Sequence, residues 1–470
     1  MYLPPGPRLP SLAQTAAMIA QPTSFFDRCL QRYGDAFTLR VLGPKSPPVV
    51  FFSQPEAVQA IFTTLAPHLE LGRVTHVFRP LVGSESMIMQ EGDRHRQQRH
   101  LLMPALHGEH LDSYGQLIRA IATQGIAAWA LGQTVSFRPW MAHISLDIIM
   151  RVVFGLQPSP RYRALRALLD ELLEAITDPL YSVQFFLPPL QQDWGTWSPW
   201  GRFVRRRAQI DAILFAEIQD KRQSQKNGAA ATDGTSVLDL LLAVRDDAGQ
   251  PLGDQELRDQ LMTLLLLGHE TTASALTWAL YWIHREGGMR DRLVAELSAL
   301  GDDADPTAIN QIPYLNAVCQ EALRLYPIAL IAQPRRVRSP IELAGYEFPS
   351  GSVLVPCIYT AHRRPDVYPE PLAFRPERFL ERKISPYEYF PFGGGSRRCI
   401  GMALALYEMK LVLATVLTQV RLSLVHPDQP VYPFRRGITF VPPARLAQAK
   451  VEERRSPPAI ANLAAGQAGG

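Results

Sequence analysis

The chain has four cysteines, and one of them stands in a segment rich in glycine and arginine. Cys399 comes shortly after the triplet Gly393, Gly394 and Gly395, and an apolar, helix-prone run begins at Met402. Consecutive glycines let a backbone lie against a flat group because they carry no Cβ. Backbone N–H groups at the start of a helix favour a thiolate over a thiol. These residues therefore suit a thiolate that binds the iron of a haem.

A simpler interpretation of Cys399 is a buried structural cysteine after a surface turn.

The other cysteines are Cys29, Cys319 and Cys357, and the four form no Cys-x-x-Cys spacing. The sequence therefore predicts neither a structural zinc site nor a disulfide framework. We therefore expect the protein to work in a reducing cytoplasm.

The most apolar stretch of the chain, residues 261–283, is interrupted by polar residues at its centre. Gly268 costs about 1 kcal/mol relative to alanine inside a helix, and the hydroxyl of Thr271 can bond back to the preceding turn. An acid beside an alcohol in an apolar helix, here Glu270 and Thr271, is a candidate proton relay. A buried Glu270 that is satisfied by an arginine or a water fits the same pattern.

Two further pairs share a helix face. Glu321 and Arg324 are three residues apart in an apolar helix, and such a pair needs more partners if it is buried. The segment 374–379 offers a third charge; on a surface, the pair would contribute little. His95 and Arg99, four residues apart, present two donors suited to an anion, although a solvated basic face has the same spacing.

Together and in this order, these segments resemble the cytochrome P450 superfamily of haem-thiolate proteins over nearly the whole chain. The positions that match the family's patterns are Phe392, Gly395, Arg397, Cys399 and Gly401 for the cysteine signature, Glu321 and Arg324 for Glu-x-x-Arg, Pro376, Arg378 and Phe379 for Pro-x-Arg-Phe, and Glu270 and Thr271 for the acid–alcohol pair. The sequence departs from the family at Leu267, where a small residue is usual, and at His95, where many members have tryptophan.

The resemblance implies haem b (iron protoporphyrin IX) as cofactor and Cys399 as the ligand of its iron. The residues that it places around the cofactor are His95, Arg99, Arg335, Phe392 and Arg397, with the histidine and the arginines on the propionates. Arg335 is placed by its spacing of ten residues to Gly345, and Arg336 is the alternative. Glu321, Arg324 and Arg378 are implied to form a buried brace beneath the haem.

The implied activity is a monooxygenase that inserts one oxygen atom of O₂ into a hydrophobic substrate such as a fatty acid or terpenoid. Glu270 and Thr271 would be the catalytic residues of proton delivery. Electrons would come from a separate partner, of the ferredoxin with ferredoxin reductase type or the flavodoxin type. Two alternatives are a peroxide-using relative, which typically lacks the acid–alcohol pair, and a haem sensor or carrier without turnover.

These residues require a scaffold that is mainly α with a minor β part, in one large helical domain over residues 1–452. A helix from Asp254 to Gly287 would cross the whole domain, and a last helix would run from Cys399 to about Thr418. Strands are expected near residues 36–41, 49–52, 341–343, 352–356 and 438–441. Residues 453–470 are expected to be a disordered tail, and 226–236 a flexible loop.

The composition excludes some partners. The 48 basic and 44 acidic residues give a net charge of +4, which does not favour nucleic acid. A basic patch of Arg382, Lys383, Arg397 and Arg398 would suit an acidic electron carrier. No secretory signal is visible at the N-terminus, and ionisable residues argue against a membrane-spanning segment at 261–283. We expect a monomer in the cytoplasm.

Three apolar segments are expected to face the substrate, at residues 77–89, 178–200 and 330–332, together with Leu267 and Thr272 over the haem. The second contains Trp194, Trp197 and Trp200 and would also form a lid with peripheral membrane contact. Ordinary loop packing explains the same residues.

Overall fold

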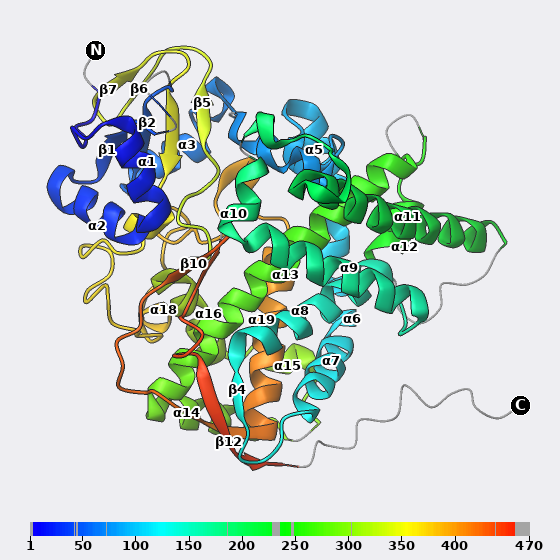
Figure 1. Cartoon of the computed structure of the whole chain (residues 1–470). Helices are drawn as coiled ribbons and strands as arrows, with labels where there is room; N and C mark the ends of the chain where they lie inside the picture. Colours follow the sequence, from blue (N-terminus) through cyan, green and yellow to red (C-terminus); the bar gives the residue numbers. More distant parts are fainter. Residues whose placement is uncertain are drawn as a thin grey trace, which may run out of the picture.

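The computed structural model of the chain has a large body of helices and a smaller sheet region at the end that holds the N-terminus (Figure 1). It describes residues 3–455 except 42, 44–45, 72, 186, 228–235, 246–248, 302 and 438. Most of the loop predicted at 226–236 therefore lies outside the described residues, as does the predicted tail from residue 456 onward.

Helices make up most of the described chain. They are α1 (Ser11–Ala20), α2 (Pro22–Tyr33), α3 (Pro55–Phe62), α4 (Arg79–Val82), α5 (Gly92–Leu102), α6 (Glu109–Ser113), α7 (Gly115–Ala127), α8 (Phe137–Phe154), α9 (Pro160–Thr177), α10 (Pro179–Ser182), α11 (Pro199–Lys226), α12 (Val237–Ala243), α13 (Asp254–Arg285), α14 (Gly287–Ser298), α15 (Pro306–Asn310), α16 (Pro313–Leu325), α17 (Ile358–Ala361), α18 (Arg378–Glu381) and α19 (Met402–Gln419).

The strands are short and form four small sheets. They are β1 (Ala36–Leu39), β2 (Val49–Phe52), β3 (Leu69–Leu71), β4 (Thr134–Ser136), β5 (Arg335–Val337), β6 (Ile341–Leu343), β7 (Tyr346–Phe348), β8 (Val353–Pro356), β9 (Val420–Leu424), β10 (Phe434–Arg436), β11 (Thr439–Val441) and β12 (Gln448–Arg454). The largest sheet has the order β1-β2-β8-β5-β3, and β2 runs parallel to β8 with Val49 opposite Val353. The others are β4-β12-β9 and the hairpins β6-β7 and β10-β11.

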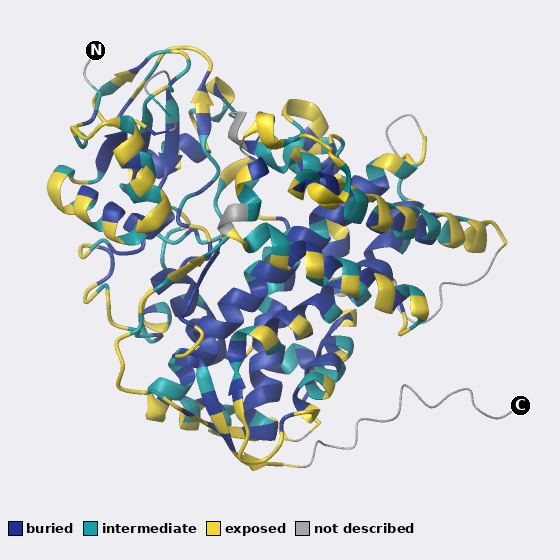
Figure 2. Ribbon diagram, in the orientation of Figure 1, coloured by how far each residue is buried: buried dark blue, intermediate teal, exposed yellow. Residues whose placement is uncertain are grey.

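Helix α13 is the predicted long helix and passes through the middle of the body (Figures 1 and 2). It has 32 residues, or about 48 Å at 1.5 Å per residue. Asp254 is its first residue, and Gly253 is the capping residue in place of the predicted Asp254. Trp278 stacks on Tyr326 with ring centres 3.6 Å apart, which joins α13 to the end of α16.

The last helix, α19, starts three residues later than predicted, so Cys399 precedes it. This is the one described helix that is long and apolar enough to cross a bilayer, and 72% of it is buried inside the protein. Helix α13 is also mostly buried, as was predicted from the ionisable residues at its centre.

The C-terminal strand corrects the predicted domain boundary. Glu453 and Arg454 belong to β12 and pair with Arg421 and Val420 of β9, so the boundary placed at residue 452 falls inside a strand. Ladder hydrogen bonds to a neighbouring strand hold these polar residues in place, and polar composition alone does not reveal such pairing.

Candidate active site

The loop before α19 presents Cys399 on a tight backbone structure. The Cys399 N–H donates to the carbonyl of Phe392 at 2.9 Å, and the Arg398 N–H donates to the carbonyl of Gly395 at 3.2 Å. Gly393 and Gly395 have φ angles of 69° and 63°, in the left-handed region that favours glycine. The backbone therefore closes on itself in a tight turn, and Cys399 at its end is exposed.

The glycine triplet lies against a side chain of the protein. A Cβ on Gly394 would come within 2.3 Å of the ring of Phe62, at the end of α3, and a Cβ on Gly395 within 2.5 Å of the Phe62 carbonyl oxygen. The prediction that the glycines allow contact with a flat group is met here by the phenylalanine ring. Close contact with Phe62 therefore explains why Gly394 and Gly395 carry no side chain, and no cofactor is needed for that explanation.

Cys399 is the one exposed cysteine among the four, which are all unpaired. Protein atoms nevertheless crowd its thiol, and this desolvation raises the thiol pKa, while the Gly401 N–H, Arg99 and Arg398 act to lower it. The predicted effect of the N–H groups at the helix start is present, since the Gly401 N–H acts to lower the pKa of the thiol, but in the protein alone desolvation outweighs it. An iron ligand would shift the balance, because a coordinated thiol loses its proton.

Three cations and a histidine gather beside this loop from separate elements. His95 and Arg99 lie on α5, Arg335 on β5, and Arg397 in the cysteine loop, and the three arginines each act to lower the pKa of His95. Arg99 donates to the carbonyl of Arg398 at 2.6 Å, and Arg397 to the carbonyl of Gln90 at 2.6 Å. Arg336 is exposed and pairs with Glu70, so Arg335 is the arginine of β5 that belongs to this group.

The four side chains carry more positive charge than the one carboxylate that acts on Arg335 and Arg397, Glu91, can balance. Burial and the neighbouring Arg397 lower the pKa of Arg335 to about 10, and burial likewise lowers the pKa of Arg397 to about 10. Nη1 of Arg397 is buried without a hydrogen-bond partner among the described residues. A buried unpaired donor is costly, so this cluster fits a group that carries carboxylates, as the propionates of haem do.

Helix α13 has one partly open face. Leu264, Leu267, Gly268 and Thr271 keep part of their surface accessible, whereas the residues around them are buried. Their spacing of three, four and seven residues puts them on one side of the helix. Thr271 Oγ1 donates to the carbonyl of Leu267 at 2.7 Å, as predicted for a hydroxyl that bonds back.

Glu270 points to other partners than Thr271. Arg138 of α8 donates to both of its carboxylate oxygens, at 2.9 Å and 2.7 Å, and Nε of Arg436 on β10 lies 3.5 Å from Oε1. This geometry matches the second interpretation of the sequence, in which Glu270 is buried and satisfied by an arginine. Arg436 also pairs with Glu174 of α9.

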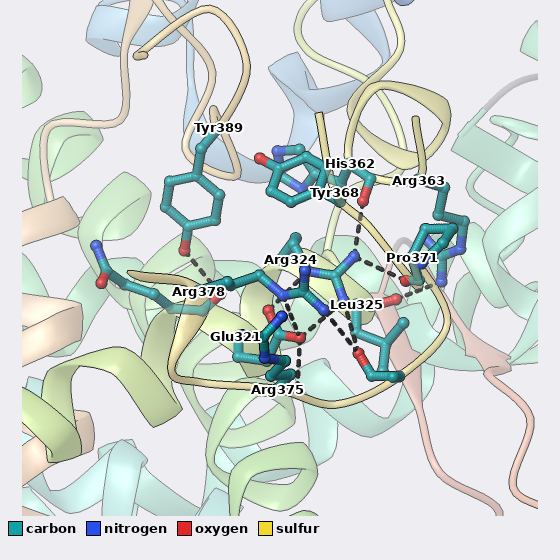
Figure 3. Close-up of polar contacts among 12 residues, drawn as sticks. Glu321, Arg324, Leu325, His362, Arg363, Tyr368, Pro371, Arg375, Arg378 and Tyr389 are labelled. Atoms are coloured by element: carbon teal, nitrogen blue, oxygen red, sulfur yellow. Dashed lines mark hydrogen bonds and ion pairs between the residues drawn. The ribbon is translucent and has the colours of Figure 1, made fainter. Parts of the chain in front are cut away.

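The Glu-x-x-Arg pair is fully buried and has the predicted third charge (Figure 3). Arg324 donates to both oxygens of Glu321, at 2.6 Å and 2.8 Å, and Arg378 donates to Oε1 at 3.1 Å. The backbone N–H of Arg375 adds a bond of 2.8 Å to the same carboxylate. These extra donors offset the cost of burying the charges.

The network continues to the cysteine loop. Arg324 also donates to the carbonyl of His362 at 2.8 Å, and the imidazole Nε2 of His362 accepts the N–H of Phe390 at 3.0 Å. The carbonyl of Phe390 then accepts the N–H of Gly393 at 2.9 Å. The buried charges thus fix the segment from which Cys399 extends.

Some predictions are not supported by the contacts. Leu330 and Ala332 are buried in two hydrophobic clusters around the sheet region, with Ile331 packed against one of them. Arg382, which was predicted to belong to a basic patch, pairs with Glu388.

The sequence did not reveal Arg138 and Arg436 as partners of Glu270. Single arginines in distant segments of the chain show a shared partner only after folding.

The comparisons with known proteins agree with this geometry. The family model described as Cytochrome P450 matches residues 3–451. Cytochrome P450 135B1 of Mycobacterium tuberculosis is 35% identical over 425 residues, 90% of this chain and 86% of that protein. Cytochrome P450 135A1 of the same organism is 34% identical over 441 residues, 94% of this chain and 93% of that protein.

Solved structures share the fold. A retinoic-acid-bound cyanobacterial CYP120A1 is 28% identical with a TM-score of 0.81, covering 96% of this chain and 99% of that one. The haem domain of cytochrome P450DA has the same TM-score at 21% identity. The match along the chain, the shared fold and the cysteine loop with its cations lead to one conclusion: this chain belongs to the cytochrome P450 family, whose members are haem-thiolate monooxygenases with haem b.

Proposed function

We propose that this P450 uses O₂ to hydroxylate a hydrophobic substrate, such as a fatty acid or terpenoid, with electrons from a separate redox partner. The observation that carries the proposal is the open face of α13, where Thr271 stands among Leu264, Leu267 and Gly268 next to the acid Glu270. Peroxide-using relatives typically lack this acid–alcohol pair, which argues against the peroxide alternative.

In this proposal, Cys399 is the iron ligand, with Phe392 beside the haem, and His95, Arg99, Arg335 and Arg397 hold the propionates. The unpartnered Nη1 of Arg397 supports this, since a carboxylate would complete it. His95 would donate as a neutral imidazole, because burial and the nearby arginines lower its pKa to about 4. When bound, the haem supplies the oxygen-activating chemistry, and its thiolate ligand favours O–O cleavage.

The protein contributes proton delivery from α13. The Thr271 hydroxyl, now bonded to the Leu267 carbonyl, would turn toward the open face to pass a proton. Glu270 can pass on a proton only after it leaves Arg138 and takes that proton from water, because both of its oxygens now accept from the guanidinium. We therefore include release of Glu270 from Arg138 as a step of proton delivery.

The apolar residues of the same face and a relative support the proposed substrate class. The cyanobacterial protein of similar fold is described as bound to retinoic acid, an isoprenoid acid. Leu264 and Leu267 offer only apolar surface, which suits a hydrocarbon chain or ring. Titration of candidate fatty acids and terpenoids, followed by the spectral change as water leaves ferric haem, would identify the preferred class.

The electron carrier would dock near Cys399. Arg398 is exposed next to the cysteine, and Arg99 bonds to its carbonyl. An acidic ferredoxin or flavodoxin fits such a basic surface. The rate of reduction should then fall as salt rises, and Arg398→Glu should weaken that dependence.

We propose that the protein works in the cytoplasm, which fits its four unpaired cysteines. The segment 178–200, expected to form a lid, would make a peripheral contact with membrane. Trp194 and Trp197 are 72% and 90% exposed, and Leu187 and Leu190 are exposed in the same segment. Tryptophan is enriched where apolar and wet surfaces meet. Sedimentation with phospholipid vesicles should fall for the double variant Trp194→Ala, Trp197→Ala, and equal sedimentation would remove this part of the proposal.

One experiment tests the central proposal. The purified protein is assayed with NADPH plus a ferredoxin and its reductase, and separately with hydrogen peroxide alone. Product that depends on O₂ and on the electron carriers supports the monooxygenase. Product from peroxide at an equal or higher rate would favour the peroxide-using alternative, and tight haem binding without product from a broad substrate panel would favour a sensor or carrier.

A further inference from the structure

The segment 83–87 covers the N-terminal end of the open face of α13. Gln260 lies seven residues before Leu267, which is two turns, so the two side chains share that side of the helix. The Gln260 side chain accepts the Met87 N–H at 3.1 Å and donates to the Glu85 carbonyl at 2.9 Å. The segment is therefore bonded to α13 where the open face begins.

A second side chain of α13 fixes the same segment. The carboxylate of Asp259 accepts the Glu85 N–H at 2.9 Å. One turn later, Thr263 Oγ1 lies 2.6 Å from Ser86 Oγ, and all three side chains of α13 and the segment in these bonds are buried. Gly83 has a φ of 92°, and a Cβ there would come within 2.1 Å of the Asp259 carboxylate. Only glycine fits at this position, so the segment and the helix form one packed unit.

Asp259 is in turn held by an arginine that reaches the neighbouring helix α11. Arg258 is fully buried and donates to Asp259 Oδ1 at 2.6 Å. It also donates through Nε to Asp211 Oδ1 of α11 at 2.7 Å. A buried guanidinium needs partners on several sides, because it carries five donors and a charge. The contact of Asp259 with the segment therefore continues to α11.

Asp211 binds a second arginine with its other oxygen. Nε of Arg207, one turn earlier on α11, lies 3.6 Å from Asp211 Oδ2. The guanidinium of Arg207 donates to the carbonyl of Pro80 in α4. Helix α11 thus reaches α4 through Arg207 and the segment 83–87 through Arg258, and Asp211 is common to both contacts.

Helix α11 also carries the segment 178–200, which directly precedes most of it. Phe185 of that segment packs edge-on against Phe203 of α11, with ring centres 5.1 Å apart, and both rings are buried. Phe203 lies eight residues before Asp211, or about 12 Å along the helix. A shift of the segment 178–200 that moves the first turns of α11 therefore also moves Asp211.

We propose that Asp211 is a positioning residue for the substrate site: through Arg207 and Arg258 it couples α11 to the segment over the open face of α13, so that the two walls of the site loosen and tighten together. The two segments expected to face the substrate, 77–89 and 178–200, then respond as one unit. The proposal rests on the proposed function only in taking this face as the substrate site. It gives Asp211 no contact with the substrate or the haem.

Removal of the Asp211 carboxylate leaves the buried charges balanced. Arg258 keeps Asp259 as its partner, and Arg207 is partly exposed, so water can reach its guanidinium. Asp211→Ala therefore breaks the connection to α11 without leaving a fully buried charge unpaired. Asp211→Asn keeps the size of the side chain and removes only its charge, and it serves as the second variant if Asp211→Ala does not fold.

The test is hydrogen–deuterium exchange of haem-loaded protein at neutral pH, read on peptides that cover residues 79–89. The Glu85 N–H reports the contact directly, because it donates to Asp259. In Asp211→Ala we expect exchange in these peptides to rise roughly three- to tenfold, since the acceptor is held less firmly. Exchange equal to that of wild type would overturn the proposal.

Arg222→Ala is the matched control. Arg222 of α11 pairs with Asp254 of α13 at 2.8 Å, so this pair joins the same two helices. The other bonds of the pair in the described part of the chain go to the Leu252 carbonyl and to Gln219, away from residues 79–89. We expect these peptides to exchange as in wild type. An equal rise in both variants would indicate general loosening between the helices and would remove the role of Asp211.

The coupling should also act in the opposite direction, because coupling between two sites is reciprocal. Gln260→Leu removes both bonds of this side chain to the segment 83–87. It should therefore raise exchange in the first turns of α11, residues 199–211, as well as in residues 79–89. A rise confined to residues 79–89 would contradict the coupling.

A second measurement separates this proposal from the proposed function. The probe is 4-phenylimidazole, an azole that binds haem iron, and its association and dissociation rates are followed by stopped-flow absorbance. In Asp211→Ala we expect both rates to rise roughly three- to tenfold with little change in the dissociation constant, because a looser wall opens more often. Arg222→Ala should match wild type. If exchange rises but neither rate does, the coupling through Asp211 stands and the open face of α13 is not the substrate site.

Discussion

Arg138 of α8 holds both carboxylate oxygens of Glu270 on α13, at 2.9 Å and 2.7 Å. The acid of the acid–alcohol pair is therefore fixed by another helix and turned away from its neighbour Thr271. We therefore expect two separate roles in this pair, Glu270 in stability and Thr271 in the proposed proton delivery, and each can be measured.

Removal of the arginine should destabilise the protein. Arg138→Ala leaves a buried carboxylate with Arg436 at 3.5 Å as its remaining cation, and loss of one partner of a buried pair costs about 3–5 kcal/mol. Denaturant unfolding followed by tryptophan fluorescence measures this loss. Arg421→Ala is the matched control, because its pair with Glu453 is more than half exposed and contributes less than about 1 kcal/mol.

The threonine hydroxyl should control how electrons are used. In Thr271→Ala we expect product per NADPH to fall by about tenfold or more, with peroxide released instead, because a proton donor is lost. Thr272→Ala is the control, since Thr272 also bonds back to α13 but is buried away from the open face. Equal coupling in wild type and Thr271→Ala would contradict the assignment.

The buried network beneath the cysteine loop should be needed for haem retention. Arg324→Ala removes the bonds to Glu321 and to the His362 carbonyl, so we expect a loss of about 3–5 kcal/mol and a lower haem content after purification. Lys450→Ala, which breaks an exposed pair with Glu452 on β12, serves as control. Both quantities are read from denaturant curves and from haem absorbance per protein.

Two neighbouring glycines should respond differently to the same change. Gly394→Ala places a Cβ 2.3 Å from the Phe62 ring, so haem retention should fall and then recover when Phe62→Ala is added. Gly395→Ala meets the Phe62 backbone carbonyl and requires a φ of 63°, so Phe62→Ala should not rescue it. Rescue of both variants would show that the ring is not the specific obstacle.

Acid should destabilise the fold through His269. Burial, aided by Arg138, lowers its pKa from 6.5 to about 4. The unfolded chain therefore binds a proton that the folded chain rejects, so stability is complete above pH 6.5 and falls by about 3 kcal/mol as the pH drops to 4. In His269→Leu this loss should be smaller, whereas the exposed His100→Leu should behave as wild type. Unfolding free energies at pH 7 and pH 4.5 provide the comparison.

The sequence by itself determined the family, the cysteine loop and the order of the helices. Those features depend on local residue types: glycines with left-handed backbone, an apolar period of 3.6 residues, and Glu321 three residues before Arg324. The long helix was predicted to within a few residues for the same reason. The choice between Arg335 and Arg336 needed the structure, because neighbouring strand residues point to opposite faces.

Only the tertiary structure decided which distant residues share a partner. Arg138 and Glu270 are 132 residues apart, and Ser145 reaches the His269 carbonyl across 124. Neither contact follows from periodicity, because helix packing sets which faces meet. Burial also acts against one predicted effect, since desolvation raises the pKa of the Cys399 thiol while the Gly401 N–H acts to lower it. Such effects depend on how many protein atoms surround a group, and this is fixed only when the chain has folded.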